Sequence, residues 1–201
     1  MRFSEAVSDL FSRSSGKEPG VDAAREALRE LGNPEQSLSV ILVGGTNGKG
    51  STASMIDKML RSQGFRVGLF RSPHVDTVRE RIKVNGEMIS RESFLKLYQK
   101  LENSCRELSF FQFLTVMAYT FFRRQQVEYA VMEAGMGGRL DATNAANPEI
   151  SVITGLGADH TEYLGEKPEE IARELCGIIS DRVVIGGDNE ELLSQARKAS
   201  E

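Results

Sequence analysis

The chain has 201 residues and a formal net charge of −4, with 40% hydrophobic and 27% charged residues. This is the composition of a globular protein, and its negative charge disfavours nucleic acid as a partner. The apolar runs are strand-sized, so we expect no membrane span and no membrane partner, and residues 1–5 lack the apolar core of a signal peptide. Cys105 and Cys176 are too few for a disulfide framework. We therefore expect a cytoplasmic protein with free thiols.

Helical and strand-like patterns alternate along the chain. In chain order they predict helix 3–13, helix 21–31, strand 38–43, a helix to about residue 62, strand 65–70, strands 81–84 and 87–89, helices 91–103 and 110–123, strands 127–132 and 150–154, helix 168–179, strand 182–185 and helix 190–198. Strands that alternate with helices are typical of an α/β fold, with a mainly parallel sheet flanked by helices. We expect residues 1–201 to form a single domain of this kind.

Two local patterns make sharper predictions within these elements. Asn85-Gly86 stands between two short strands and suits a type I′ hairpin turn. In the helix that ends near residue 62, Met55, Ile56, Met59 and Leu60 are expected to share the buried face.

A glycine-rich segment directly follows the first predicted strand. It reads Gly44-Gly45-Thr46-Asn47-Gly48-Lys49-Gly50-Ser51-Thr52. Glycines let backbone N–H groups curl round a phosphate, and the following helix presents its positive N-terminus to the same anion. Lys49 would add a charge near the β- and γ-phosphates, and the hydroxyl of Ser51 or Thr52 could reach a magnesium ion. The strict Walker pattern is not met at Val43 and Gly50, so the alternative is a glycine-rich turn with a surface lysine.

Four further segments that carry polar residues or glycines follow this loop along the chain. They are Ser72-Pro73-His74 with Glu80-Arg81-Ile82, then Phe111-Gln112-Phe113-Leu114-Thr115, then Glu133 to Asn144, then Asp159-His160-Thr161-Glu162-Tyr163-Leu164-Gly165. Together the five segments resemble the folylpolyglutamate and dihydrofolate synthases of the Mur ligase superfamily. The run Gly-Gly-Arg-Leu-Asp-Ala-Thr-Asn is the most specific of them, and the resemblance covers almost all of the chain.

The resemblance implies a fold like the central ATP-binding domain of Mur ligases and an ATP-dependent carboxylate–amine ligase. Such an enzyme converts a folate or pteroate carboxylate to an acyl phosphate and joins glutamate to it. ATP would bind at Gly45, Thr46, Asn47, Gly48, Lys49, Gly50, Ser51 and Thr52, and Mg²⁺ at Ser72, Glu133 and His160. The catalytic residues would be Lys49 and His160. The folate substrate would meet His74, Gln112, Arg139, Leu140, Asp141 and Ala142.

Ordinary chemistry supports some of these roles and leaves alternatives for others. Glu133 follows an apolar run, so it is expected at the carboxyl end of a strand, where ligands of α/β sheets bind. Magnesium prefers hard oxygen ligands. Alternatively, Glu133 is a surface carboxylate, His160 lies in a helix cap, and Arg139 pairs with Asp141. The charged run 79–81 would then be a solvated loop.

Three features depart from the family pattern. Leu175 stands where the resemblance places a carbamylated lysine, and leucine cannot bind metal; Ile171, Leu175 and Ile178 would instead form one apolar helix face. Gln112 replaces a glutamate and loses its charge. The chain stops at Glu201, before the family's residues for adenine and ribose. We therefore expect an incomplete ATP-binding domain that lacks the C-terminal ligase domain.

These departures leave two functions open. The first is the ligase, here as its N-terminal part. The second is a catalytically silent nucleotide-binding or scaffold module derived from that family. A general phosphate-loop kinase or NTPase is a weaker alternative, because it leaves the other four segments unexplained. A truncated sheet is expected to expose an edge that invites self-association or a complementing chain.

Overall fold

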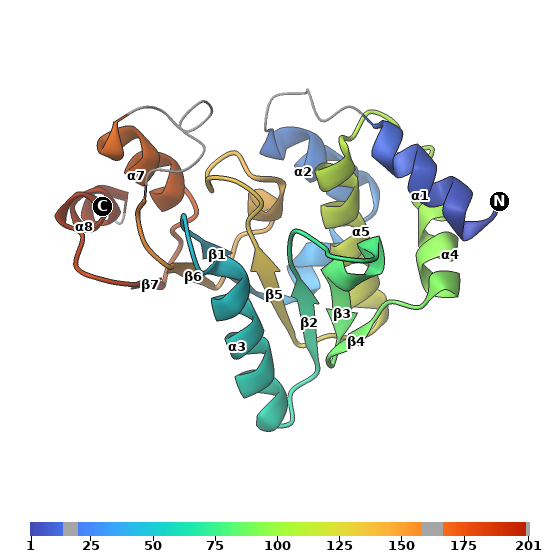
Figure 1. The fold of residues 1–201 in the computed structure, drawn as a ribbon, viewed down its shortest axis with the longest axis horizontal. Coiled ribbons are helices and arrows are strands. Elements are labelled where there is room, and N and C mark those ends of the chain that lie inside the picture. Colours follow the sequence, from blue (N-terminus) through green and yellow to red (C-terminus); the bar gives the residue numbers. More distant parts are fainter. Residues whose placement is uncertain (14–19, 158–166, 200–201) are drawn as a thin grey trace.

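The computed structural model describes residues 1–13, 20–157 and 167–199. A seven-stranded sheet forms the centre of the molecule (Figure 1). Its strands are β1 (Ser39–Gly44), β2 (Val67–Phe70), β3 (Ile82–Val84), β4 (Glu87–Met88), β5 (Tyr129–Glu133), β6 (Ile150–Ile153) and β7 (Val183–Ile185), in the order β4-β3-β2-β5-β1-β6-β7. The β2–β3 and β3–β4 pairs are antiparallel, whereas the other neighbours pair parallel. The predicted α/β fold with a mainly parallel sheet is confirmed.

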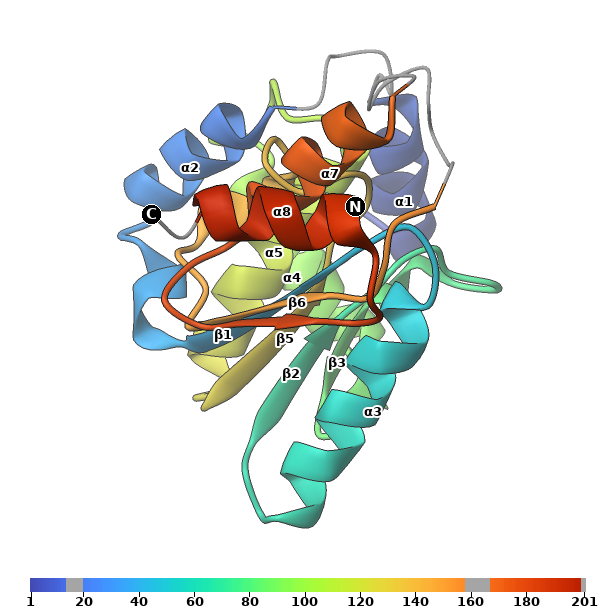
Figure 2. The same cartoon turned by 90° about the vertical axis from the view of Figure 1, so that its left-hand side faces the viewer.

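Helices cover the two faces of this sheet unequally (Figure 2). One face carries α3 (Lys49–Ser62), which packs over β1, β2 and β5. The opposite face carries α1 (Phe3–Ser12), α2 (Val21–Glu30), α4 (Arg91–Leu101), α5 (Phe110–Arg124), α7 (Pro168–Cys176) and α8 (Glu190–Ala199). Short 3₁₀ helices lie at η1 (Pro34–Ser37), η2 (Val78–Arg81) and η3 (Ala142–Ala145). In the described part of the chain, no helix combines the length and the apolar character needed to cross a bilayer.

α5 is the central helix of the more heavily covered face. Its residues from Gln112 to Phe122 are all buried, so the helix is packed on all sides. α5 approaches β2 so closely that a Cβ on Gly68 would lie 2.7 Å from Cδ1 of Phe122. Glycine at this strand position therefore permits the contact between helix and sheet.

α3 buries a different stripe from the predicted one. Ile56 and Leu60 pack against the sheet, but Met55 and Met59 are 61% and 59% exposed. The buried stripe carries Asp57 instead, whose carboxylate is neutralised by an arginine one turn later. The prediction was wrong for the two methionines because a helix that lies alone on its face buries only a narrow stripe.

The register of the sheet brings the ends of its strands to one edge. Val43 of β1 lies opposite Glu133 of β5, and Gly44 lies opposite Ile153 of β6. The segments that follow these strands must therefore meet. At the other end of the sheet, Asn85 and Gly86 have φ angles of 50° and 84°, as the predicted type I′ turn between β3 and β4 requires.

Candidate functional site

The glycine-rich loop joins the carboxyl end of β1 to α3. Gly45 and Gly48 have φ angles of +124° and +81°, which L-residues with a side chain rarely adopt. Gly48 is the N-cap of α3 and provides no side-chain cap. The first N–H groups of a helix have no acceptor within it, so the amides of the first turn of α3 suit an anion. The conformation expected of a phosphate loop is present.

Two threonine hydroxyls, one in the loop and one after β6, tie this loop to the segment that follows β6. Thr154 Oγ1 donates to the carbonyls of Asn47 (2.7 Å) and Gly44 (3.2 Å). Thr46 Oγ1 donates to Gly157 O (3.2 Å) and accepts from Gly157 N (2.9 Å). The Lys49 ammonium donates to the carbonyls of Gly45 (2.8 Å) and Thr46 (3.1 Å), which holds it against the loop. The loop is therefore held in one shape by the protein itself.

Glu133 ends β5 beside this loop and is only 4% exposed. Its Oε2 accepts from the backbone N of Ser72 (2.8 Å). Its Oε1 lies 3.0 Å from where a Cβ on Gly50 would stand, so the carboxylate rests against the first turn of α3. Burial raises the pKa of Glu133, while the Ser72 amide and the charges of Arg71, Lys49 and Arg81 oppose that rise.

Glu133 and Ser72 together offer hard oxygen donors next to the anion site. This donor set fits Mg²⁺, which binds through one or two carboxylates and completes its shell with water and phosphate oxygens. Within the described ranges, no three His, Cys, Asp or Glu side chains gather closely enough to hold a metal by themselves. His160, the third predicted ligand, lies outside the described residues. A magnesium site here would therefore depend on phosphate oxygens as well as on the protein.

An arginine–histidine pair lines the site on the β2 side. Arg81 Nε donates to His74 Nδ1 (2.8 Å), and the guanidinium lies 5.2 Å from the ring centroid of Phe110. Phe11 stacks on Phe110 with 5.0 Å between ring centroids. Burial, followed by the nearby Arg81 charge, lowers the pKa of His74. The charged run 79–81 is therefore a 3₁₀ helix with a buried arginine, and the solvated-loop alternative is wrong.

Comparison with known proteins identifies the family. The model described as Mur ligase middle domain matches residues 43–200. The chain belongs to the Mur ligase middle domain family. It is 39% identical over 207 residues to a probable bifunctional folylpolyglutamate synthase/dihydropteroate synthase of Haloferax volcanii, covering 98% of this chain and 25% of that protein. It is 38% identical over 179 residues to the dihydrofolate synthase/folylpolyglutamate synthase of Bacillus subtilis, covering 85% and 42%.

A solved structure described as the FPGS-AMPPCP-folate complex shares the fold of this Mur ligase domain. Its TM-score is 0.94 at 32% identity, and the match covers 99% of this chain and 52% of that chain. The chain thus spans about a quarter to a half of the length of these relatives. The suspected resemblance to folylpolyglutamate and dihydrofolate synthases is confirmed.

In this Mur ligase domain, Asp141 organises the glycine-rich loop between β5 and η3. Its carboxylate accepts from the amides of Gly135 (2.9 Å), Met136 (3.0 Å) and Thr143 (2.9 Å), and from the Thr143 hydroxyl. Burial raises the pKa of Asp141, and these hydrogen bonds oppose the rise. Arg139 pairs instead with Glu174 of α7, 2.6 Å away, so the alternative of an Arg139–Asp141 pair is wrong.

Both polar atoms of the Gln112 side chain are likewise hydrogen-bonded within the chain. Its Oε1 accepts from Ser109 N (2.9 Å) at the start of α5, and its Nε2 donates to Gly20 O (2.8 Å). Ala142 is buried and Leu140 half-buried in the loop that Asp141 organises. The substrate contacts assigned to these residues stay a prediction. The structure shows that Gln112 and Asp141 already have hydrogen-bond partners within the chain.

Leu175 lies in the core on α7. It is 1% exposed and packs with Ile171 and Ile178, as the apolar-face interpretation predicts. The position at which the resemblance implies a lysine is therefore an apolar packing position in this chain.

Glu80 orders the loop between Ser72 and η2. Its carboxylate accepts from the amides of Val75 (3.0 Å), Asp76 (2.8 Å) and Thr77 (2.7 Å). These bonds lower its pKa from 4.5 to about 2. The loop that carries His74 is therefore held by a single carboxylate.

We expect Glu80→Gln to lower the free energy of unfolding in a pH-dependent way. Because the folded pKa is below the unfolded one, the carboxylate contributes fully above pH 4.5, and its contribution declines as pH falls towards about 2. Urea unfolding at a series of pH values would show the difference between wild type and variant shrinking over that range. Glu87→Gln, which removes an exposed carboxylate on β4, is the control. A difference that stays constant from neutral pH to pH 2 would contradict the capping role.

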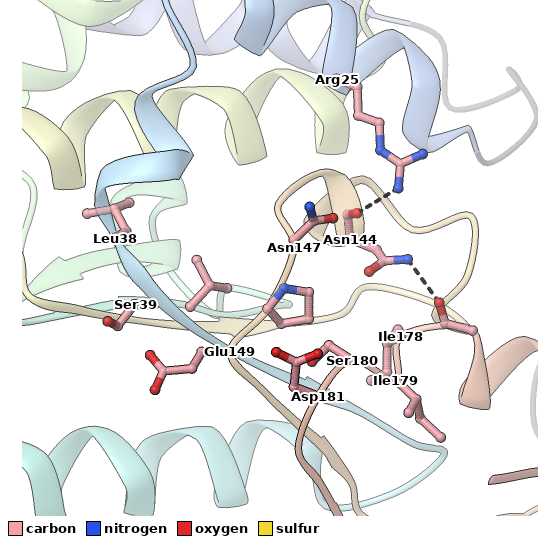
Figure 3. A pocket seen from close by; sticks show the side chains of 13 residues that line it. Arg25, Leu38, Ser39, Asn144, Asn147, Glu149, Ile178, Ile179, Ser180 and Asp181 are labelled. Atoms are coloured by element: carbon pink, nitrogen blue, oxygen red, sulfur yellow. Dashed lines mark hydrogen bonds between the residues drawn. The ribbon is translucent and has the colours of Figure 1, made fainter. Parts of the chain in front are cut away.

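A cavity of about 590 Å³ opens at the opposite edge of the sheet (Figure 3). Ser39 and Glu149, at the amino ends of β1 and β6, line it together with Asp181. Within it, Arg25 Nη2 donates to the Asn144 carbonyl (3.2 Å). Ser39 and Glu149 lie at the opposite ends of the strands from the phosphate loop, Ser72 and Glu133.

Proposed function

We propose that the chain is the nucleotide- and metal-binding part of an ATP-dependent ligase that adds glutamate to folate or dihydropteroate. The observation that supports this most is the position of Glu133 and Ser72 beside the braced phosphate loop and Lys49. The relatives are described as synthases, which favours the ligase over a module that binds nucleotide without turnover.

The phosphate loop would bind the triphosphate of ATP. AMPPCP, an ATP analogue, is named with the solved relative. Here the first-turn amides of α3 and the Lys49 ammonium would neutralise the β- and γ-phosphates. The hydroxyls of Ser51 and Thr52 lie in the same turn, within the segment Gly45 to Thr52 that the sequence assigns to ATP.

Glu133 and Ser72 would hold Mg²⁺, with His160 as the predicted third ligand. When bound, the ion stabilises the negative charge that moves during phosphoryl transfer. Burial of Glu133 keeps its carboxylate in a region where a divalent cation attracts it strongly. The Ser72 amide orients the carboxylate towards α3.

The reaction needs mainly positioning and charge neutralisation from this chain. A substrate carboxylate oxygen attacks the γ-phosphorus of ATP, which gives an acyl phosphate and ADP. The amine of glutamate then attacks the acyl carbon, phosphate leaves, and the nitrogen loses a proton as the amide forms. Lys49 and the α3 amides would bind the phosphoryl oxygens throughout the first step.

The folate would lie beside Phe110 and His74, next to the loop that bears Arg139, Leu140 and Ala142. Flat aromatic side chains suit a pterin or aminobenzoyl ring. Asp141 and Gln112 would shape this wall through the loop and the start of α5.

We also propose association through β7, with a second copy or a complementing chain. Among the described strands β7 pairs with β6 alone, and Val184 on it is 57% exposed. Such an edge readily pairs with another strand. An elution volume in gel filtration that stays monomeric at high concentration would count against it. We further propose that the protein acts in the cytoplasm, which the two free cysteines favour.

Calorimetry with magnesium-ATP on the 201-residue chain tests the nucleotide site. We expect one ATP to bind per chain, and binding to weaken at least tenfold when EDTA removes the metal. A folded chain that gives no binding heat, and does not compete for a fluorescent ATP analogue, would overturn the proposal.

A further inference from the structure

Arg81 is a buried cation that the proposed chemistry has not yet used. The residue is 8% exposed. Its Nε donates to His74 Nδ1, and its guanidinium faces the Phe110 ring. Its backbone carbonyl accepts from Arg71 N (3.0 Å), which fixes η2 next to Ser72. The backbone and one edge of the guanidinium are therefore held in place.

The groups in direct contact with this guanidinium carry no negative charge, although the Glu133 carboxylate acts on it from further away and opposes the lowering of the Arg81 pKa that burial causes. A histidine nitrogen that accepts a hydrogen bond carries no proton, so His74 is a neutral partner, and Phe110 is apolar. Within the described ranges, no carboxylate forms an ion pair with Arg81, and its two Nη groups make no hydrogen bond. A buried charge without a carboxylate in direct contact is costly, so an anionic ligand is expected at the Nη side.

The position of Arg81 indicates which anion this is. Glu133 is close enough to both Lys49 and Arg81 for each cation to oppose the rise of its pKa. Lys49 lies at the phosphate loop, which follows β1, whereas Arg81 lies in η2, which comes after β2 in the chain. An anion at Arg81 would therefore lie across the metal position from the nucleotide, where the second substrate of a phosphoryl transfer must approach.

We propose that Arg81 binds the reacting carboxylate of the acceptor substrate, and then the acyl phosphate formed from it. The guanidinium fork matches a planar carboxylate and a phosphoryl group equally well. This assignment rests on the proposed function and names the residue that selects the ionised acid. The arginines on either side of it in this region are only half-buried, and each already donates to an acceptor: Arg71 to Ser54 Oγ (3.0 Å) and Arg79 to Ile89 O (3.0 Å).

The test compares pteroate with its methyl ester, which has the same rings but no negative charge. Affinities of both are measured on the whole chain in the presence of magnesium and AMPPCP. Wild type is expected to bind pteroate at least tenfold more tightly than the ester. Arg81→Met is expected to abolish that preference and to change AMPPCP affinity by less than threefold. Arg81→Lys is expected to retain a reduced preference for the acid, because lysine keeps the positive charge but lacks the paired N–H groups of the guanidinium.

Arg79→Met is the matched control, because Arg79 lies in the same 3₁₀ helix and binds a backbone carbonyl. It is expected to keep the full preference for the acid. Equal affinity of wild type for acid and ester would overturn the role of Arg81, as would an unchanged preference in Arg81→Met. If Arg81→Met does not fold, an Arg81→Lys variant with the wild-type preference overturns it equally. Absence of AMPPCP binding to wild type would instead reject the proposed function itself.

Discussion

Lys49→Ala is expected to weaken magnesium-ATP binding about 100-fold. The lysine ammonium makes charge-assisted hydrogen bonds to phosphate oxygens, and such bonds contribute about 2–3 kcal/mol. That range corresponds to roughly 30- to 150-fold in the dissociation constant. The ammonium is already held over the loop by the carbonyls of Gly45 and Thr46, so little ordering is needed when nucleotide binds. Calorimetric titration of wild type and variant at one ionic strength measures the change.

Lys58→Ala is the control for the lost charge. Lys58 lies exposed on the same helix, more than two turns from the loop. It should leave the affinity within about twofold, because exposed charges at that distance are largely screened. If Lys49→Ala binds ATP as tightly as Lys58→Ala does, the lysine does not contact the phosphates.

Gly45→Ala is expected to abolish ATP binding and to destabilise the fold by about 3 kcal/mol or more. A φ of +124° is strained for any residue with a Cβ, and that Cβ would also meet Thr154 Oγ1 and lie 2.9 Å from Thr154 N. Backbone strain and overpacking each cost about 1–3 kcal/mol. Relief requires the loop to move off β6, which breaks the Thr154 hydrogen bonds that shape it. Urea unfolding and ATP titration measure the two effects.

Gly64→Ala separates the two costs. Gly64 also has a positive φ, of +90°, but nothing lies within 4 Å of an added Cβ. It should cost about 1–2 kcal/mol from backbone strain alone and leave ATP binding unchanged. Equal losses of stability in both variants would mean that the packing against Thr154 contributes nothing.

The order of the elements was predictable because local patterns decide it. The apolar run before Glu133 made a strand, and the register of the sheet then placed its carboxylate at the phosphate loop. The Asn85-Gly86 turn could be predicted from its own two residues. By contrast, the exposure of Met55 and Met59 depends on how many elements share the α3 face, which helical spacing does not reveal.

The braces of the site were missed for a related reason. Thr154 contacts Asn47 across 107 positions of sequence, so no local pattern relates the two. The ends of parallel strands do meet, and a threonine directly after β6 and before a glycine was the available clue. Arg81 was hidden by the mixed charges around it, which are typical of solvated segments. The hydrogen bonds of Asp141 depend on how the loop folds back on itself, and this is also tertiary information.

The close backbone contact between α7 and the loop after β5 couples the positions of these two segments. A Cβ on Gly138 would lie 2.9 Å from Glu174 O, and the Arg139 amide donates to that same carbonyl (2.9 Å). Leu175 is buried in the core, so the backbone of α7 and that of the loop after β5 are closely packed. A displacement of α7 would therefore carry the Gly138–Arg139 backbone with it, and so reshape the loop that we propose lies next to the acceptor substrate.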